Sequence, residues 1–216
     1  MVAEYIMSKT PNLRECLAYG WDRVKRHPVF HIGGSSIVGA VAILTGGVLL
    51  GPMIAGYFMA EEQVDADACP RPTDVFAGFR RNPGATIIVS LLYAAASTVL
   101  LIALGLAAFA ANLASQDVAV WVLAIGGLLL LLAGLASLPF FLHVVYRAGV
   151  RGEADAFASI RQAWEDVRPC FGAWMFASMV LLGIGLSGMC FCCLGQVVTL
   201  PVAYAGLFRL SGQIAR

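Results

Sequence analysis

Long parts of this chain of 216 residues have almost no charge. Lysine and arginine are missing from residues 27–70, 82–146 and 169–208, and acidic residues are also missing from 27–60. Charged residues make up 12% of the chain, against roughly 25% in soluble domains. Each uncharged stretch exceeds the ~20 apolar residues that cross a bilayer. This lack of charge excludes an ordinary soluble domain and predicts an all-α integral membrane protein.

The chain also lacks the signals of nucleic-acid binding and of catalysis. Its net charge of +1 leaves no basic face for nucleic acid. Gly33 to Ser36 are small and polar but lack the lysine that completes a phosphate-binding loop. The polar segments are too short to form a catalytic domain. We therefore assign no catalytic, cofactor-binding or metal-binding residue, and we predict a protein that is not an enzyme.

The fourteen lysine and arginine residues lie in four segments, 9–26, 71–81, 147–168 and 209–216. Positive residues close to membrane helices are retained in the cytoplasm. A chain whose basic segments are all cytoplasmic must cross the membrane an even number of times between them. The expected arrangement is a single multi-pass domain over 1–216, with about six transmembrane helices as three hairpins and with both termini in the cytoplasm.

The first apolar stretch is the hardest to divide. Val29 to Ala60 contains 32 residues, enough for one steep helix of about 48 Å or for two runs somewhat short for a ~30 Å hydrocarbon core. Thr45 to Gly47 is the natural turn between two runs. A single long helix would give five crossings and place the first two basic segments on opposite sides, and this alternative stays open. The other stretches divide at Asn112 to Asp117 and at Gly188 to Gly195.

A pattern recurs three times along the chain, over residues 12–62, 72–148 and 155–212. Each unit begins with a short aromatic and charged segment that ends in proline, and each closes with a proline followed by aromatic residues. The prolines of the first kind are Pro28, Pro83 and Pro169, and those of the second kind are Pro52, Pro139 and Pro201. We interpret each unit as an interfacial helix, a helical hairpin and a proline-bearing last helix. Three such units would pack around an approximate axis along the membrane normal.

The leading segments of the first and third units are predicted to be amphipathic helices in the membrane interface. The N-terminal segment, 1–28, is expected to be cytoplasmic and not a cleaved export signal, with Thr10 and Pro11 at the start of its helix. The residues on the apolar faces are Leu13, Leu17, Trp21 and Val24, and then Phe157, Ile160, Trp164 and Val167. Such helices anchor a protein and set helix tilt, or recruit anionic lipid through their basic faces.

The chain resembles small six-span bacterial membrane proteins of the YciC-like uncharacterised kind and, in outline, the membrane domain of some glycerophosphodiester phosphodiesterases. The resemblance rests on three regions: Leu50 to Phe58, Asp74 to Phe79, and Ala163-Trp164 with Leu200-Pro201. It implies the same six-span fold in the bacterial cytoplasmic membrane. It implies no activity, since these families have none established and the sequence shows no phosphodiesterase domain.

Histidine and cysteine are the side chains that would bind a metal here. His31 and His143 are predicted near the cytoplasmic ends of their helices, where two imidazoles could meet and ligate a metal or haem iron. We prefer to interpret each as a polar residue at a helix interface. Cys190, Cys192 and Cys193 lie at the outer turn of the last hairpin. Packed thiols are preferred there, with a disulfide or a soft-metal site as alternatives.

Small residues recur at four-residue spacing in two places, at Ala103, Ala107, Ala111 and Ser115 and at Gly47, Gly51 and Ala55. Such stripes let helix backbones approach closely, either within one chain or in a homo-oligomer. The predicted spans contain no ionisable residue that would mark a proton pathway. We therefore expect a non-enzymatic bacterial membrane scaffold or accessory protein that organises lipid or partner proteins.

The alternative function is a transporter or channel for a neutral or lipid-like solute. Hydroxyl side chains within the predicted spans, including Ser90, Ser97 and Thr199, could line its path. This function requires a continuous polar cavity among the three hairpins, which the scaffold does not.

Overall fold

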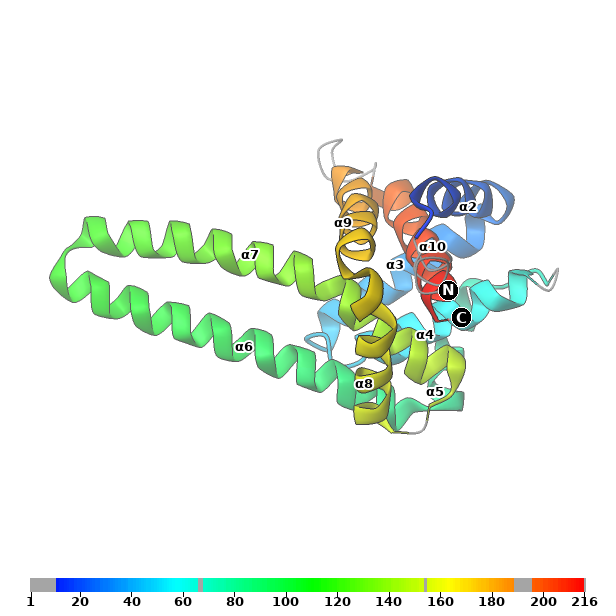
Figure 1. The fold of residues 1–216 in the computed structure, drawn as a ribbon, viewed down its shortest axis with the longest axis horizontal. Coiled ribbons are helices and arrows are strands. Elements are labelled where there is room, and N and C mark those ends of the chain that lie inside the picture. Colours follow the sequence, from blue (N-terminus) through cyan, green and yellow to red (C-terminus); the bar gives the residue numbers. More distant parts are fainter. Residues whose placement is uncertain (1–10, 66–67, 154, 189–195, 216) are drawn as a thin grey trace.

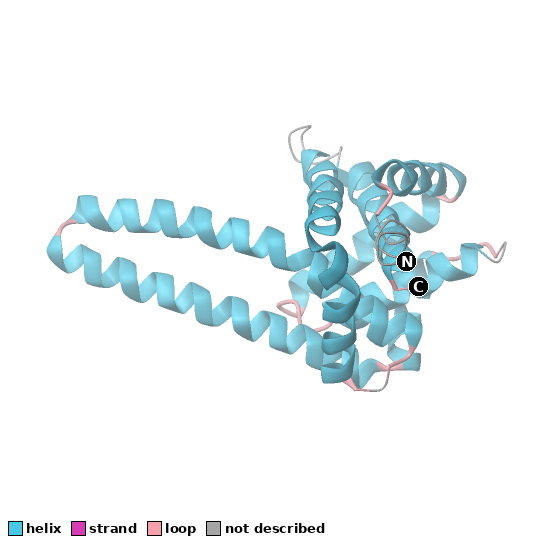
Figure 2. Cartoon of the chain, in the orientation of Figure 1, coloured by secondary structure: helices cyan, strands magenta, loops and turns pink. Residues whose placement is uncertain are grey.

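The computed structural model describes residues 11–65, 68–153, 155–188 and 196–215, and these form helices joined by short turns, with no strand (Figures 1 and 2). The predicted all-helical fold class is confirmed. Three pairs of consecutive helices occupy the apolar stretches: α3 (Pro28–Leu44) with α4 (Leu50–Asp65), α6 (Pro83–Ala114) with α7 (Gln116–Tyr146), and α9 (Phe171–Ser187) with α10 (Gln196–Ile214). The two helices of each pair contact each other.

Shorter helices precede each pair. They are α2 (Leu13–Arg26) before α3, η1 (Pro72–Ala77) and α5 (Gly78–Arg81) before α6, and α8 (Ala156–Val167) with the turn η3 (Arg168–Cys170) before α9. A π-helical turn, η2 (Arg147–Arg151), follows α7. Each apolar pair thus has a short leading helix, as the sequence pattern predicts.

Polar side chains explain where several helices begin. The Asn12 side chain accepts a hydrogen bond from the Glu15 amide at 3.2 Å and starts α2. The predicted start at Pro11 is therefore wrong, because Asn12 supplies the cap. Ser115 accepts a hydrogen bond from the Val118 amide at 3.1 Å, which allows α7 to begin after a single residue of turn.

The first apolar stretch forms two helices and not one. α3 ends at Leu44, and Gly46 and Gly47 have φ values of 57° and 84°, which glycine adopts without steric cost. This confirms the predicted turn and excludes a single long helix over the stretch. With 17 and 16 residues, α3 and α4 are about 26 Å and 24 Å long, shorter than a ~30 Å hydrocarbon core.

The α6–α7 pair is a long hairpin that projects away from the other helices (Figure 1). Its helices contain 32 and 31 residues and are about 48 Å and 46 Å long. Among the described residues, three helical segments are long and apolar enough to cross a membrane: Pro83–Ala114, Gln116–Arg151 and Ala156–Ser187. The pair Leu13–Arg26 and Pro28–Leu44, bent by 104°, would make a fourth.

The last helix of each unit packs against the leading helix of the next. α4 lies so close to η1 that a Cβ on Gly56 would overlap the Val75 carbonyl group. α7 contacts α8. α10 approaches α2 equally closely, because a Cβ on Gly20 would overlap the Val202 carbonyl oxygen. Near the two ends of the chain, α2 and α10 are therefore in close contact.

The leading helices α2 and α8 pack against the protein through small residues and leave part of their predicted apolar faces at the surface. α2 buries Cys16, Gly20 and Val24, and leaves Trp21 half exposed. α8 likewise buries its small residues and leaves Trp164 half exposed. Small side chains allow the helix axes to approach closely. Small residues therefore face the contact, and the bulkier aromatic residues do not. The predicted apolar faces are thus divided between the interior and the surface.

Candidate functional site

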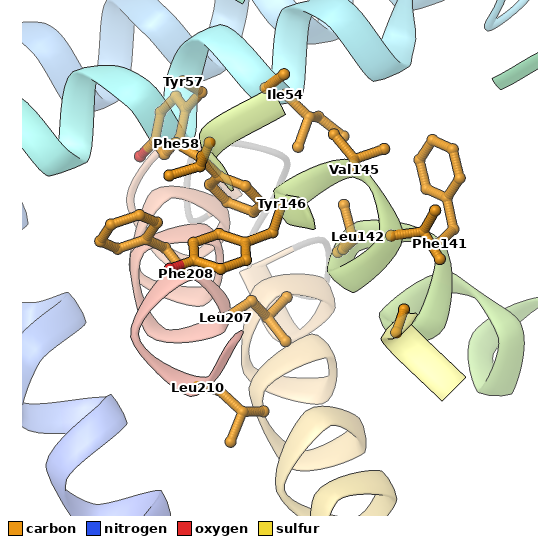
Figure 3. Close-up of a cluster of buried hydrophobic side chains, with 14 of the residues drawn as sticks. Ile54, Tyr57, Phe58, Phe141, Leu142, Val145, Tyr146, Leu207, Phe208 and Leu210 are labelled. Carbon is orange, nitrogen blue, oxygen red and sulfur yellow. The ribbon is translucent and has the colours of Figure 1, made fainter. Parts of the chain in front are cut away.

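Three aromatic side chains, one each from α4, α7 and α10, meet in a buried hydrophobic cluster (Figure 3). Phe58 of α4 lies 6.3 Å from Tyr146 of α7 and 5.7 Å from Phe208 of α10, measured between ring centroids. Tyr146 and Phe208 are also 5.7 Å apart. All three rings are buried. They are the aromatic residues that follow the second proline of each unit, and together they fill the space where the three last helices converge.

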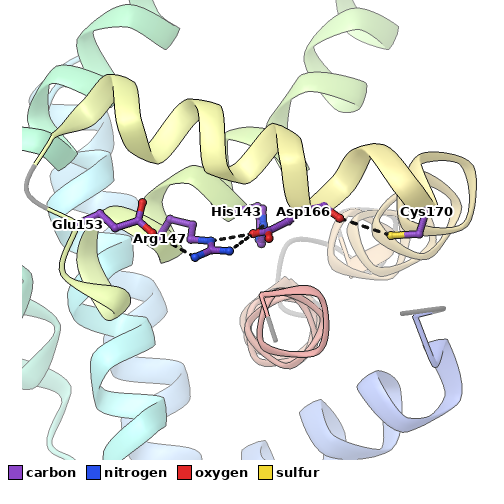
Figure 4. Close-up of polar contacts among 5 residues, drawn as sticks. All are labelled: His143, Arg147, Glu153, Asp166 and Cys170. Carbon is purple, nitrogen blue, oxygen red and sulfur yellow. Dashed lines mark hydrogen bonds and ion pairs between the residues drawn. The ribbon is translucent and has the colours of Figure 1, made fainter. Parts of the chain in front are cut away.

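A polar network ties α7 to α8 (Figure 4). His143 and Arg147 are four residues apart and therefore lie on one side of the helix as α7 passes into η2. Arg147 Nε donates to Asp166 Oδ2 at 2.7 Å, and its Nη1 donates to Glu153 Oε1 at 3.1 Å. His143 Nε2 lies 3.2 Å from the same Asp166 oxygen. One guanidinium group thus bridges two carboxylates beside a buried imidazole.

The network is nearly closed to solvent. The Arg147 side chain is 16% exposed, that of Asp166 is 12% exposed, and His143 is fully buried. Removing one partner from such a pair leaves an uncompensated charge away from water, which is strongly destabilising. Asn82 extends the network to the start of α6, because its amide donates to the carbonyl oxygens of Ala148 and Glu153. The network therefore fixes the base of the α6–α7 hairpin relative to α8.

A second buried cluster lies between α3 and α4. His31 Nδ1 is 2.8 Å from Tyr57 Oη and 3.2 Å from Glu61 Oε1, and all three side chains are buried. Glu61 stands next to Glu62 and near Asp65 in a charged part of the sequence, but the structure buries it on α4. Burial raises the pKa of Glu61 to about 8, while the charge of Arg23 and a hydrogen bond from Tyr19 act in the opposite direction. Glu61 lies outside the candidate spans.

The two histidines belong to different clusters, and no contact joins His31 to His143 among the described residues. Within the same part of the chain, no three His, Cys, Asp or Glu side chains are placed to hold a metal ion. Cys190, Cys192 and Cys193 lie outside the described residues. The alternatives for those three thiols stay as the sequence leaves them.

The two stripes of small residues differ in their surroundings. At Gly51, a Cβ would overlap the Thr86 carbonyl group, and the Gly51 amide donates to Ser90 Oγ at 2.8 Å. Gly51 therefore packs against α6, and Ala55 lies against Gly149 of η2, whereas a Cβ at Gly47 in the turn would meet nothing within 4 Å. Ala103 and Ala107 of the α6 stripe are exposed. The second stripe thus leaves a surface at which another helix could pack closely.

An apolar cleft of about 490 Å³ lies between α6 and α7. Leucine, alanine and glycine supply most of its lining, and Tyr93, Ser97 and Ser137 supply hydroxyl groups. The Ser137 hydroxyl donates to Tyr93 Oη at 3.4 Å. Clefts of this size hold small molecules in many proteins. Its chemistry suits a lipid-like molecule with a large hydrocarbon part.

Sequence reasoning missed the buried carboxylates Glu61 and Asp166, because each stands in a charged segment that reads as solvent-exposed. The signal that could have revealed the α7–α8 network is the four-residue spacing of His143 and Arg147 at the end of an apolar helix. Comparison of the chain with protein-family models, curated proteins and solved structures found no match.

Proposed function

We propose that this chain is a non-enzymatic scaffold or accessory protein of the bacterial cytoplasmic membrane, which organises lipid or partner proteins. The observation that carries the proposal is the α6–α7 hairpin, whose helices expose large apolar side chains along most of their length. These include Leu101, Leu106, Phe109, Val120, Trp121 and Leu129. A monomeric soluble protein does not expose such a surface, so lipid or partner helices cover it.

In the proposed topology every hairpin begins and ends on the cytoplasmic side. The α6–α7 hairpin supplies two crossings, and the shorter α3–α4 and α9–α10 pairs supply two each where the bilayer thins around them, which makes six. A re-entrant α3–α4 hairpin would return the chain to the same side, because the turn at Gly46 and Gly47 reverses its direction. The cytoplasmic position of the basic segments is thus independent of how deeply the short hairpins insert.

The packing at the centre of the three units supports a scaffold over a channel. A solute path along the axis of the units would have to pass Phe58, Tyr146 and Phe208, whose rings are buried against one another. Close ring packing of this kind suits a rigid hub that fixes the positions of three hairpins.

Crosslinking in living cells tests the scaffold function. A photoreactive amino acid is placed at Ala103 or Leu106, which are exposed on α6, and at Val89, which is buried, as the control. We expect both exposed positions to give a reproducible adduct with one defined protein or with a second copy of this chain, and Val89 to give none. If neither exposed position gives a protein adduct, the partner-organising function is wrong.

The cleft between α6 and α7 favours a second candidate function, the transport of a lipid-like solute. Ser97 and Ser137 face this cleft from opposite helices, so Ser97→Leu and Ser137→Leu would fill it. This function predicts that the purified wild-type chain in liposomes moves a fluorescent phospholipid between leaflets. Both variants should slow that movement. Liposomes in which the wild-type chain causes no such movement would exclude this function.

A further inference from the structure

The outward face of α8 carries aromatic and arginine side chains in a regular order. Phe157, Trp164 and Phe171 are seven residues apart and are 66%, 48% and 44% exposed. Arg161 and Arg168 stand between them and are also exposed. At 100° per residue, Phe157, Arg161 and Trp164 of α8 fall within about 60° of one another around the helix. Arg168 follows in η3, and Phe171 is the first residue of α9. These five residues form one continuous surface, named here the α8 face.

The two arginines of the α8 face are available to an external partner. Arg147 is neutralised from inside by Asp166 and Glu153, whereas no ion pair within the described part of the chain involves Arg161 or Arg168. Glu165 is the acidic neighbour on the exposed side, so the surface keeps an excess of positive charge. The inner side of α8 is fixed by the network of Figure 4 and by its buried small residues. The α8 face is therefore a rigid, basic and aromatic surface.

The neighbours of Trp164 place the α8 face at the level where α7 leaves its apolar segment. The Trp164 ring lies 6.4 Å from Phe140 of α7 and 6.1 Å from Phe171 of α9, measured between centroids. Phe140 lies seven residues before Arg147, at which the basic segment begins within the candidate span Gln116–Arg151. Tryptophan is enriched at this depth, where an apolar ring meets the polar headgroups.

We propose that the α8 face binds the headgroups of anionic phospholipids. The Trp164 ring enters the boundary between headgroups and acyl chains, and Arg161 and Arg168 on either side of it contact the phosphates. The inference rests on the proposed membrane function. It specifies that the lipid which this chain organises is anionic. A basic residue near an anionic surface contributes a roughly fivefold preference, so two give anionic lipid an enrichment of up to about thirtyfold around Trp164.

Fluorescence quenching of Trp164 measures this preference. The full chain is reconstituted in vesicles of equal parts phosphatidylglycerol and phosphatidylcholine, with bromine on the acyl chains of one lipid or the other. Bromine quenches tryptophan fluorescence only at short range. Subtracting the signal of a Trp164→Phe variant gives the quenching of Trp164 alone, which reports the lipids next to it. We expect brominated phosphatidylglycerol to quench Trp164 more strongly than brominated phosphatidylcholine.

Variants identify the groups that cause the preference. Arg161→Ala with Arg168→Ala should abolish it, and the paired lysine substitutions should retain it. Arg14→Ala with Arg26→Ala removes two exposed arginines of α2 as the matched control and should leave it unchanged. Equal quenching by the two lipids in the wild-type chain, or a preference that survives the paired alanine substitutions, would overturn the proposal.

Trp121 separates failure of this inference from failure of the proposed function. Trp121 is exposed on α7 in the outer half of the hairpin, and a Trp121→Phe subtraction reports its quenching in the same vesicles. If Trp121 is quenched by both lipids and Trp164 by neither, the hairpin is embedded in the membrane but the α8 face does not bind lipid. The partner of the α8 face would then be an acidic protein. If neither tryptophan is quenched, the proposed insertion of the α6–α7 hairpin into the membrane is wrong as well.

Discussion

Arg209 of α10 forms an ion pair with Glu15 of α2, with 2.7 Å between Nη2 and Oε1, and so joins positions 194 residues apart. Arg147 makes the corresponding pair with Asp166, from the η2 turn that follows α7 to α8. In both cases the arginine directly follows an aromatic residue of the central cluster. Each pair fastens the last helix of one unit to the leading helix of the next, which supports the proposed arrangement of three similar units in a ring.

The two ion pairs should differ in their contribution to stability. The side chains of Arg147 and Asp166 are 16% and 12% exposed, whereas those of Arg209 and Glu15 are 32% and 42% exposed. We expect Asp166→Asn to lower the free energy of unfolding by about 3 kcal/mol, because it leaves a buried guanidinium short of one carboxylate. Glu15→Gln should cost no more than about 1 kcal/mol. Denaturant unfolding in detergent micelles measures both, and equal losses would contradict this ranking.

The close approach of α4 to η1 depends on Gly56. A Cβ there would overlap the backbone carbonyl of Val75, which cannot move as a flexible side chain can. Gly56→Ala should therefore destabilise the fold by about 1–3 kcal/mol. Gly105→Ala is the matched control, because a Cβ at Gly105 meets nothing within 4 Å, and alanine in a helix gains up to about 1 kcal/mol over glycine. A tolerated Gly56→Ala would show that the helices are farther apart.

Glu61 gives the fold a dependence on pH. Its pKa in the folded chain is about 8, against roughly 4.3 for an unperturbed glutamic acid. The folded chain therefore retains a proton that the unfolded chain releases between these values. The contribution of Glu61 to stability is highest below the lower pKa and falls as pH rises toward the higher one, by at most about 1.4 kcal/mol per pH unit.

Substitution of Glu61 tests this dependence. Glu61→Gln mimics the neutral acid, so we expect it to flatten the decline in the unfolding midpoint between about pH 5 and pH 8. His31, Tyr57, Tyr19 and Arg23 face the same carboxyl group and are unchanged in the variant. If the wild-type chain and the variant lose stability in parallel over this range, then Glu61 is not the group that titrates.

The sequence predicts the helix pairs and their turns because these depend on local chemistry. The glycines at 46 and 47 and the polar residues before α7 divide the apolar stretches where the structure does. The prolines and aromatics of the repeat also identify the residues that meet at the centre. The contact between these residues depends on how three separate helices pack together. A local sequence pattern cannot predict that packing.

The contacts between α2, α8 and the rest of the chain could not be predicted from amphipathic patterns. Cys16 and Gly20 are buried because α10 approaches them closely, and Trp21 is displaced to the surface by the same contact. Glu61 and Asp166 read as solvent-exposed because single-sequence reasoning treats charge as a surface property. Their burial follows from partners that lie on other helices.

Thiol labelling at three positions tests whether the first two basic segments share one side of the membrane. Single cysteines are kept or introduced at Ala18 of α2, at Cys69 and at Gln116 beside the α6–α7 turn, all of which are exposed, with the other cysteines replaced by alanine. In intact cells, a membrane-impermeant maleimide should label position 116 alone, and positions 18 and 69 should react only after the membrane is opened. Labelling of position 18 or position 69 in intact cells, or protection of position 116, would contradict the three-hairpin topology.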